Sequence, residues 1–335
     1  MPLNTTLVHK LLLYWFQEHA RELPWREERE DLKLKDPNAD KNPMVQDLKP
    51  GDRYLAGPKR DPYRVLVSEI MLQQTQVDRV IPKFQAFLKR WPTSQDFAKA
   101  SLPDVLIFWK GLGYNRRARF LHQAIKTVVE QFHAQFPQTL EELLRLPGLG
   151  PYTASAVAVF ALGQQHPVID TNVKRILSRV WIGGEPSLVK QKELYELATQ
   201  TIPKGMADPW HQALMDLGAT ICTSKNPQCE QCPLAETCLA NQTAMKQGVK
   251  YRDVLVAAKK QQKKPSLPRF ESTDRFFRGR VVDALREKSL HLDDLREWLD
   301  AHYNLCDRAR YGQIIEGLVK DQLIELSGPF VRLKS

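Results

Sequence analysis

Apolar residues recur every three or four positions through most of the chain, a spacing typical of amphipathic and buried helices. The first such segment spans residues 5–22, and residues 61–241 show hardly any of the alternation expected of strands. Prolines in that region fall near predicted helix starts or in connections, where proline is tolerated. The pattern predicts an all-α fold with helices at residues 64–75, 77–90, 94–99, 103–109, 116–132, 139–145, 152–162, 171–181, 189–201 and 208–219.

Polar stretches divide the chain further. Residues 27–61 are charged and contain four prolines, which predicts a long insertion loop. Residues 246–270 include the run Lys-Lys-Gln-Gln-Lys-Lys-Pro-Ser and are interpreted as a basic linker. Beyond them, residues 271–335 predict a winged-helix-like module or a small packing domain, with helices at 278–287, 292–303 and 309–321 and a hairpin of 323–326 with 330–333.

The net charge of the chain indicates a polyanionic partner. The 335 residues carry 49 Lys and Arg against 39 Asp and Glu, a net charge of +10. This balance favours nucleic acid, although basic enzymes share it. The apolar run at residues 11–16 is too short to span a bilayer or to act as a signal peptide. We therefore expect no membrane partner and a cytoplasmic protein, associated with the nucleoid if the source is bacterial.

Four of the five cysteines crowd into seventeen residues with the spacing C-x6-C-x2-C-x5-C: Cys222, Cys229, Cys232 and Cys238. A chain of this length with so few cysteines is not a disulfide scaffold. Structural zinc usually shows two C-x2-C pairs, and only one is present. Four thiolates on one loop also suit an iron–sulfur cluster. Cys306 stands apart and is interpreted as a buried or inert thiol.

The stretch from Leu146 to Arg175 combines a glycine hairpin with a lone carboxylate. Gly148 and Gly150 allow close approach of another chain, and the helix that follows presents free N–H groups suited to a phosphate. Asp170 follows the apolar pair Val168-Ile169 and precedes the next helix. The spacing alone leaves two alternatives open, a structural N-cap or a reactive carboxylate.

The hairpin stretch, the cysteine spacing and the run Ser68-Glu-Ile-Met-Leu-Gln-Gln-Thr-Gln-Val77 together resemble the MutY-type adenine DNA glycosylases of the helix-hairpin-helix superfamily. The resemblance covers roughly residues 7–240 and implies a two-lobed glycosylase core over residues 1–245. By this resemblance, residues 62–180 are expected to form a six-helix domain, and residues 1–26 with 181–245 an iron–sulfur domain. The resemblance also implies a [4Fe–4S] cluster on the four cysteines and a monovalent cation at the hairpin.

The same resemblance assigns the chemistry. Glu69 is the expected general acid that protonates adenine, with its pKa raised by burial, and Asp170 the carboxylate that stabilises the sugar cation. Tyr152 and Asn172 are expected to hold Asp170 and the attacking water in place. Endonuclease III has a nucleophilic lysine where this chain has Tyr152, so no Schiff base is expected there. The expected DNA contacts are Gln73, Gln74, Thr75, Leu112, Tyr114, Leu146, Gly148, Gly150, Thr153 and Lys225.

The implied partner is double-stranded DNA with a mismatched or damaged base pair, bound by a monomer, with adenine opposite 8-oxoguanine or guanine as substrate. The insertion, Asn115 after Tyr114 and the tail depart from the family pattern, and the tail has no Phe-Ser-His stretch. Basic residues of the tail are expected to add phosphate contacts: Arg275, Arg278, Arg280, Arg308, Arg310 and Lys334. Two alternatives remain: a thymine or uracil mismatch glycosylase, which Tyr152 allows, and an iron–sulfur DNA-binding regulator without catalysis.

Overall fold

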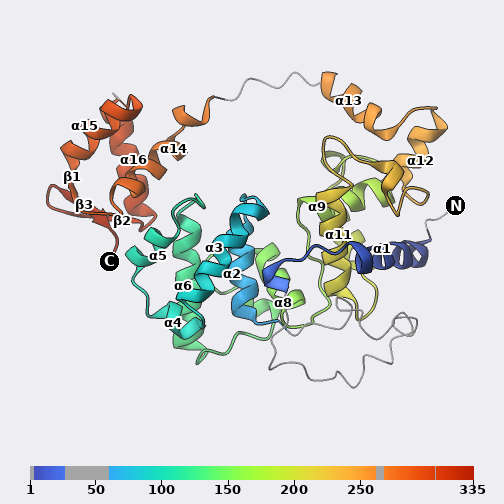
Figure 1. Ribbon diagram of the computed structural model, residues 1–335, viewed down its shortest axis with the longest axis horizontal. Helices are drawn as coiled ribbons and strands as arrows, with labels where there is room; N and C mark the ends of the chain where they lie inside the picture. Colours follow the sequence, from blue (N-terminus) through green and yellow to red (C-terminus); the bar gives the residue numbers. More distant parts are fainter. Residues whose placement is uncertain (1–3, 27–59, 262–267, 306) are drawn as a thin grey trace. The chain divides into compact units, whose positions relative to one another are not determined.

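The computed structural model describes residues 4–26, 60–261, 268–305 and 307–335. The expected insertion loop, most of which is residues 27–59, and Cys306 lie outside the described residues. The helices are α1 (Thr5–His19), α2 (Pro62–Leu72), α3 (Val77–Arg90), α4 (Ser94–Ala98), α5 (Leu102–Phe108), α6 (Arg116–Gln131), α7 (Leu140–Leu143), α8 (Pro151–Phe160), α9 (Thr171–Leu177), α10 (Gln191–Gln200), α11 (Ala207–Thr220), α12 (Leu239–Lys246), α13 (Tyr251–Gln261), α14 (Asp274–Ala284), α15 (Leu292–Tyr303) and α16 (Arg308–Lys320) (Figure 1). The predicted all-α class is confirmed.

Local capping explains where several helices begin. Thr93 accepts a hydrogen bond from the Asp96 amide, and Asp96 accepts one from the Thr93 amide, which is a capping box for α4. At the start of α5 the Ser101 side chain accepts a hydrogen bond from the Asp104 amide, and a proline lies in the first turn. These side chains satisfy amide groups that a helix start leaves without partners.

The described chain forms two compact units, each with its own packing. The first consists of residues 1–65, 138–140 and 150–264. Its core joins α1, α9, α10 and α11 through buried residues such as Phe16, Ile176 and Trp210. Asp216 of α11, fully buried, is paired with Arg26 at 2.8 Å and with Arg21 at 2.7 Å. These ion pairs tie the start of the chain to α11.

The second unit consists of residues 66–137, 141–149 and 265–335. Between α3 and α6 its core is aromatic, with edge-to-face contacts of Phe87 to Trp91, Phe97 and Phe108 at centroid distances of 5.0, 4.8 and 5.6 Å. Such pairs add to the burial of their ring surfaces.

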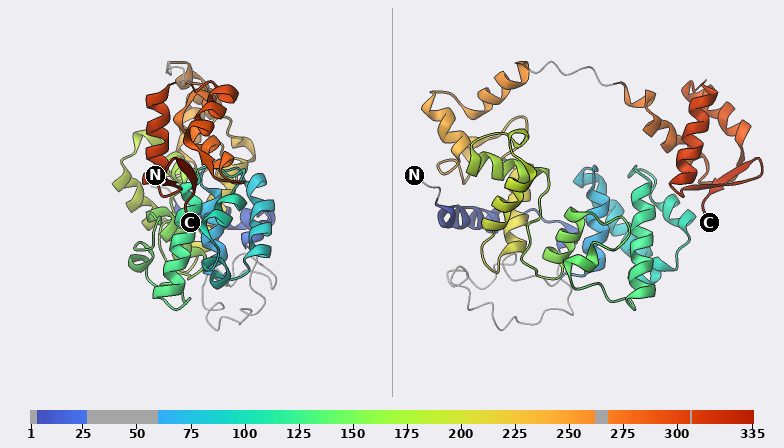
Figure 2. Two further views of the ribbon diagram at one scale, coloured as in Figure 1. Left: turned by 90° about the vertical axis from the view of Figure 1, so that its left-hand side faces the viewer. Right: turned by 180° about the vertical axis from the view of Figure 1, so that it is seen from behind.

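The C-terminal part of this unit groups α14, α15 and α16 with a small antiparallel sheet, as every view shows (Figure 2). Its strands are β1 (Leu290–His291), β2 (Ile324–Ser327) and β3 (Phe330–Leu333), in the order β1-β3-β2. The predicted hairpin is β2–β3, in which Leu326 pairs with Val331. The short strand β1 was not expected, because two residues show no alternation. We call residues 268–335 the C-terminal module.

Part of the segment interpreted as a basic linker is helical. Tyr251 and Leu255 of α13 are buried against Ala240 and Ala244 of α12. The lysine-rich composition around them obscured the spacing of these two apolar residues. Residues 262–267, the remainder of the lysine-rich run, lie outside the described residues.

Candidate active site and metal centre

Asp170 is fixed at the start of α9. One of its carboxylate oxygens, Oδ1, accepts a hydrogen bond from the Val173 amide at 2.6 Å, so the residue is the N-cap of the helix. Just before it, the buried Val168 donates its amide to Nε2 of His211 on α11 at 3.0 Å. The cap and this anchor hold the carboxylate at one place and orientation.

The electrostatics of Asp170 combine two opposing effects. Burial raises the pKa of the carboxyl, while the Val173 amide and the Asn172 side chain favour its ionised form. Asn172 donates from Nδ2 to the second oxygen, Oδ2, at 2.7 Å. Asp170 is therefore an N-cap and also a buried carboxylate held among donors, so the capping interpretation does not exclude a reactive one.

A residue that sequence reasoning missed, Arg175, connects this carboxylate to the cysteine loop. Its Nη2 donates to Oδ1 of Asn172 at 2.8 Å and to the Gly218 carbonyl at 2.7 Å. Its Nε donates to the Cys222 carbonyl at 2.7 Å. This places Asp170, Asn172 and Cys222 in one hydrogen-bonded chain. The only signal in the sequence is a basic residue one helical turn after Asn172.

Gly218 allows this arrangement. A Cβ added there would lie 2.5 Å from the Cβ of Asn172, closer than any such contact tolerates. The helices α9 and α11 therefore meet at a glycine, directly behind the side chain that orients Asp170.

Glu69 lies on α2 in the second unit and is 7% exposed, whereas Tyr152, Asp170 and Asn172 belong to the first unit. Tyr152 is half-buried in the first turn of α8. The catalytic roles of these four residues remain predictions.

The expected DNA contacts after α2 and α5 are brought together by Arg117, a second residue that sequence reasoning missed. Its guanidinium donates to the carbonyls of Ile70 at 2.9 Å and Leu112 at 2.7 Å, and to the Thr75 hydroxyl at 3.1 Å. The two loops, 73–75 and 111–114, are therefore held side by side. We call them the paired loops.

Two residues in the paired loops have unusual backbone. Gln74 and Tyr114 adopt positive φ angles of 55° and 47°. Gln74 is exposed and the Tyr114 side chain is 38% exposed, whereas Leu112 is buried. Leu112 therefore contributes packing, and its backbone is engaged within the protein: its amide donates to the Trp109 carbonyl at 3.1 Å and its carbonyl accepts from Arg117.

In the hairpin, the two glycines serve different needs. Gly148 has φ 76°, and a Cβ there would lie 2.4 Å from the Cβ of Phe120, so the fold itself requires glycine. Gly150 is the N-cap of α8, and a Cβ there would meet nothing within 4 Å. Leu146 and Thr153 are buried, at 2% and 3% exposure. The hairpin thus keeps an open glycine at a helix N-terminus, where N–H groups lack helical partners. A cation at the hairpin remains a prediction.

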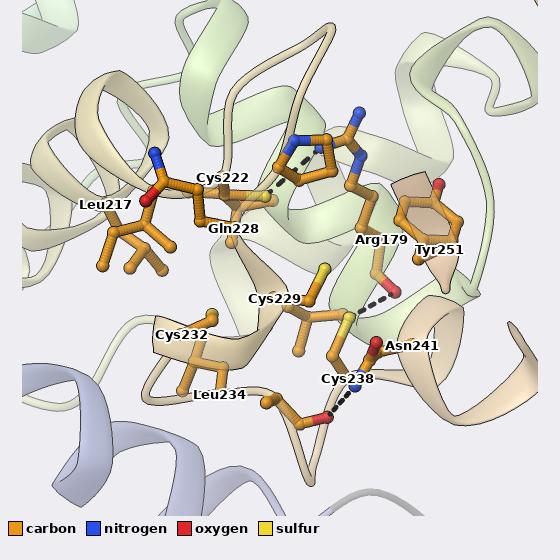
Figure 3. Close-up of a pocket in the computed structure, with 15 residues that line it drawn as sticks. Arg179, Leu217, Cys222, Gln228, Cys229, Cys232, Leu234, Cys238, Asn241 and Tyr251 are labelled. Carbon is orange, nitrogen blue, oxygen red and sulfur yellow. Dashed lines mark hydrogen bonds between the residues drawn. The ribbon is translucent and has the colours of Figure 1, made fainter. Parts of the chain in front are cut away.

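The four clustered cysteines line one pocket, which Figure 3 shows with Arg179 and Tyr251 at its edge. The rest of its wall is largely apolar, with Ile176, Leu217 and Leu234 among the lining side chains. As placed, no three of the described His, Cys, Asp and Glu side chains are set to hold a single metal ion.

The donor set fits an iron–sulfur cluster. Burial, together with the nearby sulfurs, raises the pKa of Cys232 to about 12 and that of Cys238 to about 11. Thiolates in such a pocket therefore need positive charge beside them, which iron supplies. Arg179 donates from Nη1 to the Cys222 sulfur at 3.4 Å and pairs with Glu185 at 2.7 Å. Glu185 also accepts a hydrogen bond from the Tyr251 hydroxyl at 2.8 Å.

The Cys229→Ser variant should contain less iron and give a lower soluble yield, because it lacks one of the four thiolate ligands. Wild type purified anaerobically should contain about four iron atoms per chain, from the four ligands of the loop. Iron and zinc analysis of both proteins makes the comparison, with Cys306→Ser as the matched control that keeps its iron. A colourless wild type that carries zinc and is fully active would refute the cluster.

The fold and the cysteine site define a helix-hairpin-helix DNA repair protein. Residues 67–203 match the HhH-GPD superfamily of base excision DNA repair proteins. Residues 222–238 match the iron–sulfur binding domain of endonuclease III. A thermostable thymine-DNA glycosylase superimposes with a TM-score of 0.58 at 25% identity, covering 71% of this chain and 97% of that one. A trapped endonuclease III–DNA covalent intermediate, 23% identical with a TM-score of 0.50, shares the fold over 62% of this chain and 94% of that one.

The relatives found by sequence identity indicate a narrower family. The adenine DNA glycosylase of Mycolicibacterium smegmatis is 33% identical over 94% of this chain and 91% of its own length. That of Homo sapiens is 43% identical over 69% of this chain, which spans only 39% of the human protein. The chain belongs to the adenine DNA glycosylase family. The predicted family, fold and [4Fe–4S] cluster are thereby confirmed. None of the helices in the described ranges has the length and apolar character needed to cross a bilayer.

Proposed function

We propose that this protein is a base excision repair enzyme that hydrolyses the N-glycosidic bond of adenine in double-stranded DNA, opposite 8-oxoguanine or guanine. The observation that carries the proposal is the buried Asp170 carboxylate, held by the Val173 amide and Asn172 in a chain of the adenine DNA glycosylase family. A carboxylate in this setting stabilises positive charge on a sugar.

The roles follow from the reaction. When the glycosidic bond breaks, its electron pair passes to the departing adenine and positive charge develops on the deoxyribose. Glu69 donates a proton to a ring nitrogen of adenine, which makes the base a better leaving group. Asp170, ionised, opposes the charge on the sugar, and Asn172 holds its orientation. Water then adds to the anomeric carbon and its proton restores Glu69, so the products are free adenine and an abasic site.

The proposed DNA contacts are made by residues that the structure leaves exposed. Gly150 leaves room for a phosphate at the N-terminus of α8, and the exposed Lys225 adds a positive charge on the cysteine loop. Tyr114 and Gln74 offer exposed side chains beside the base opposite the target. Extruding adenine costs a few kcal/mol, which these contacts and the net charge of +10 offset. We expect the enzyme to act as a monomer.

Tyr152→Lys should gain strand-nicking activity without alkali, because it places an amine in the first turn of α8. Wild type should release the base and leave the strand intact until alkali is added. Borohydride trapping of a covalent adduct makes the measurement, with Tyr152→Phe as the control that gains nothing. Efficient trapping of wild type would show that another amine, such as Lys174, attacks the sugar.

A second candidate is thymine or uracil removal from mismatches, which the superposition with a thymine-DNA glycosylase favours. Single-turnover cleavage, developed with alkali, separates the two on duplexes with adenine opposite 8-oxoguanine, guanine or cytosine and on G·T and G·U duplexes. We expect cleavage of the adenine duplexes, fastest opposite 8-oxoguanine and guanine. Cleavage confined to G·T and G·U would establish the second candidate, and binding without any cleavage would favour a regulator.

A further inference from the structure

The C-terminal module contacts the loop that carries Tyr114. Within the second unit, the guanidinium of Arg275 on α14 lies over the Tyr114 ring, 5.0 Å from its centroid, and donates a hydrogen bond to the Tyr114 hydroxyl. Arg286 donates to the carbonyl of Ile107 at the end of α5, at 3.2 Å, and to the Asn115 side chain at 3.4 Å. The module therefore reaches the residues on both sides of Tyr114.

The contact continues along α6. Arg119 donates to the Gln322 side chain at 2.6 Å, and Arg116 pairs with Asp321 at 3.4 Å. The end of α5, the Tyr114 loop and the start of α6 thus all bind the same module. This is a docked surface built from several polar contacts.

Several basic side chains of the C-terminal module form ion pairs with acidic side chains of the same module. Residues 268–335 contain twelve acidic and twelve basic side chains, so the net charge of +10 comes from the rest of the protein. Arg310 pairs with Asp274 at 2.7 Å, Arg280 with Asp283 at 2.6 Å, and Lys334 with Glu325 at 2.6 Å. Arg278 also pairs with Asp321. These ion pairs argue against phosphate contacts by Arg278, Arg280, Arg310 and Lys334, which were expected from the sequence of the tail.

We propose that the C-terminal module holds Tyr114 in the DNA-free enzyme and competes with the duplex for it. This inference rests on the proposed function, in which Tyr114 enters the duplex beside the opposing base. Stacking on a base requires a free ring face. Here the guanidinium of Arg275 lies over the Tyr114 ring and binds its hydroxyl. The guanidinium of Arg117 lies 5.6 Å from the centroid of the same ring. The duplex must therefore displace Arg275 before Tyr114 can insert, and each productive encounter includes release of this contact.

Full-length Arg275→Ala tests the proposal, because Arg275 is exposed and its removal leaves the core of the module intact. We expect tighter binding of an A·G duplex, by about three- to tenfold, the size expected from the net contribution of one hydrogen bond at an exposed site. The direction is diagnostic, since loss of a cation by itself weakens DNA binding. Fluorescence anisotropy at several salt concentrations gives the affinity, and single-turnover kinetics at saturating enzyme gives the rate of base release, which should be unchanged.

Arg308→Ala is the matched control. Arg308 is exposed at the start of α16, belongs to the same module and carries the same charge, but it takes no part in the contacts to the Tyr114 loop. Its removal should not tighten binding. Weaker or unchanged binding by Arg275→Ala would overturn the proposal in favour of a DNA contact or no role. A slower saturating rate would overturn it in favour of a positioning role. If wild type releases no adenine, the proposed function fails instead, and the affinity comparison still reports on the docked contact.

Discussion

Asp170→Asn should reduce single-turnover release of adenine by about 10²–10³-fold or more while duplex binding stays close to wild type. The amide preserves the size of the side chain and can still accept from the Val173 amide, but it removes the negative charge that opposes the sugar cation. Preorganised charges of this kind have effects of that size on rate. Rapid-quench kinetics with saturating enzyme and a parallel anisotropy titration measure the two effects separately.

Asp307→Asn is the matched control for this change. Asp307 caps α16 through the Ala309 and Arg310 amides, so the substitution removes the same charge from a helix cap outside the site. It should leave the rate unchanged. Near-normal turnover by Asp170→Asn would contradict the catalytic assignment.

The requirement for an ionised Asp170 also fixes the sign of the pH dependence. Burial raises the pKa of Asp170, so base release should decline on the acid side as pH falls through that raised pKa, above the range of an ordinary aspartate.

Glu69→Gln should reduce adenine release by about 10²–10⁴-fold, the typical contribution of a general acid. The amide fits the same buried position but has no proton to deliver to the leaving base. Single-turnover assays on an A·G duplex give the effect. Asp78→Asn, an exposed acid in the first turn of α3, is the control and should behave as wild type. Efficient adenine release by Glu69→Gln would remove this residue from the mechanism.

The helices were predictable because their signals are local. Apolar spacing marks α3 and α6 closely, and Thr93 and Ser101 mark helix starts through hydrogen bonds to residues a few positions away. The same holds for α15, whose observed bounds equal the predicted ones. Where the signal was weak, as in α13 with its two buried apolar residues among lysines, the helix was not predicted.

The supporting residues of the site were not predictable, because their contacts join distant parts of the chain. Arg175 meets Cys222 and Gly218 more than forty positions away, and Arg117 donates to the carbonyl of Ile70 in α2 as well as to that of Leu112 near its own helix. Neither periodicity nor spacing reports such contacts. The need for glycine at position 218 is likewise visible only when the Cβ of Asn172 lies beside it.

The identity of the base released from a mixture tests adenine removal most directly. Wild-type protein is incubated with equal amounts of A·G and G·T duplexes that are otherwise identical, and the free bases are identified by mass spectrometry. We expect free adenine from the first duplex, released at least about 100-fold more slowly by Asp170→Asn, and no thymine above the level without enzyme. Release of thymine without adenine would contradict the proposed function.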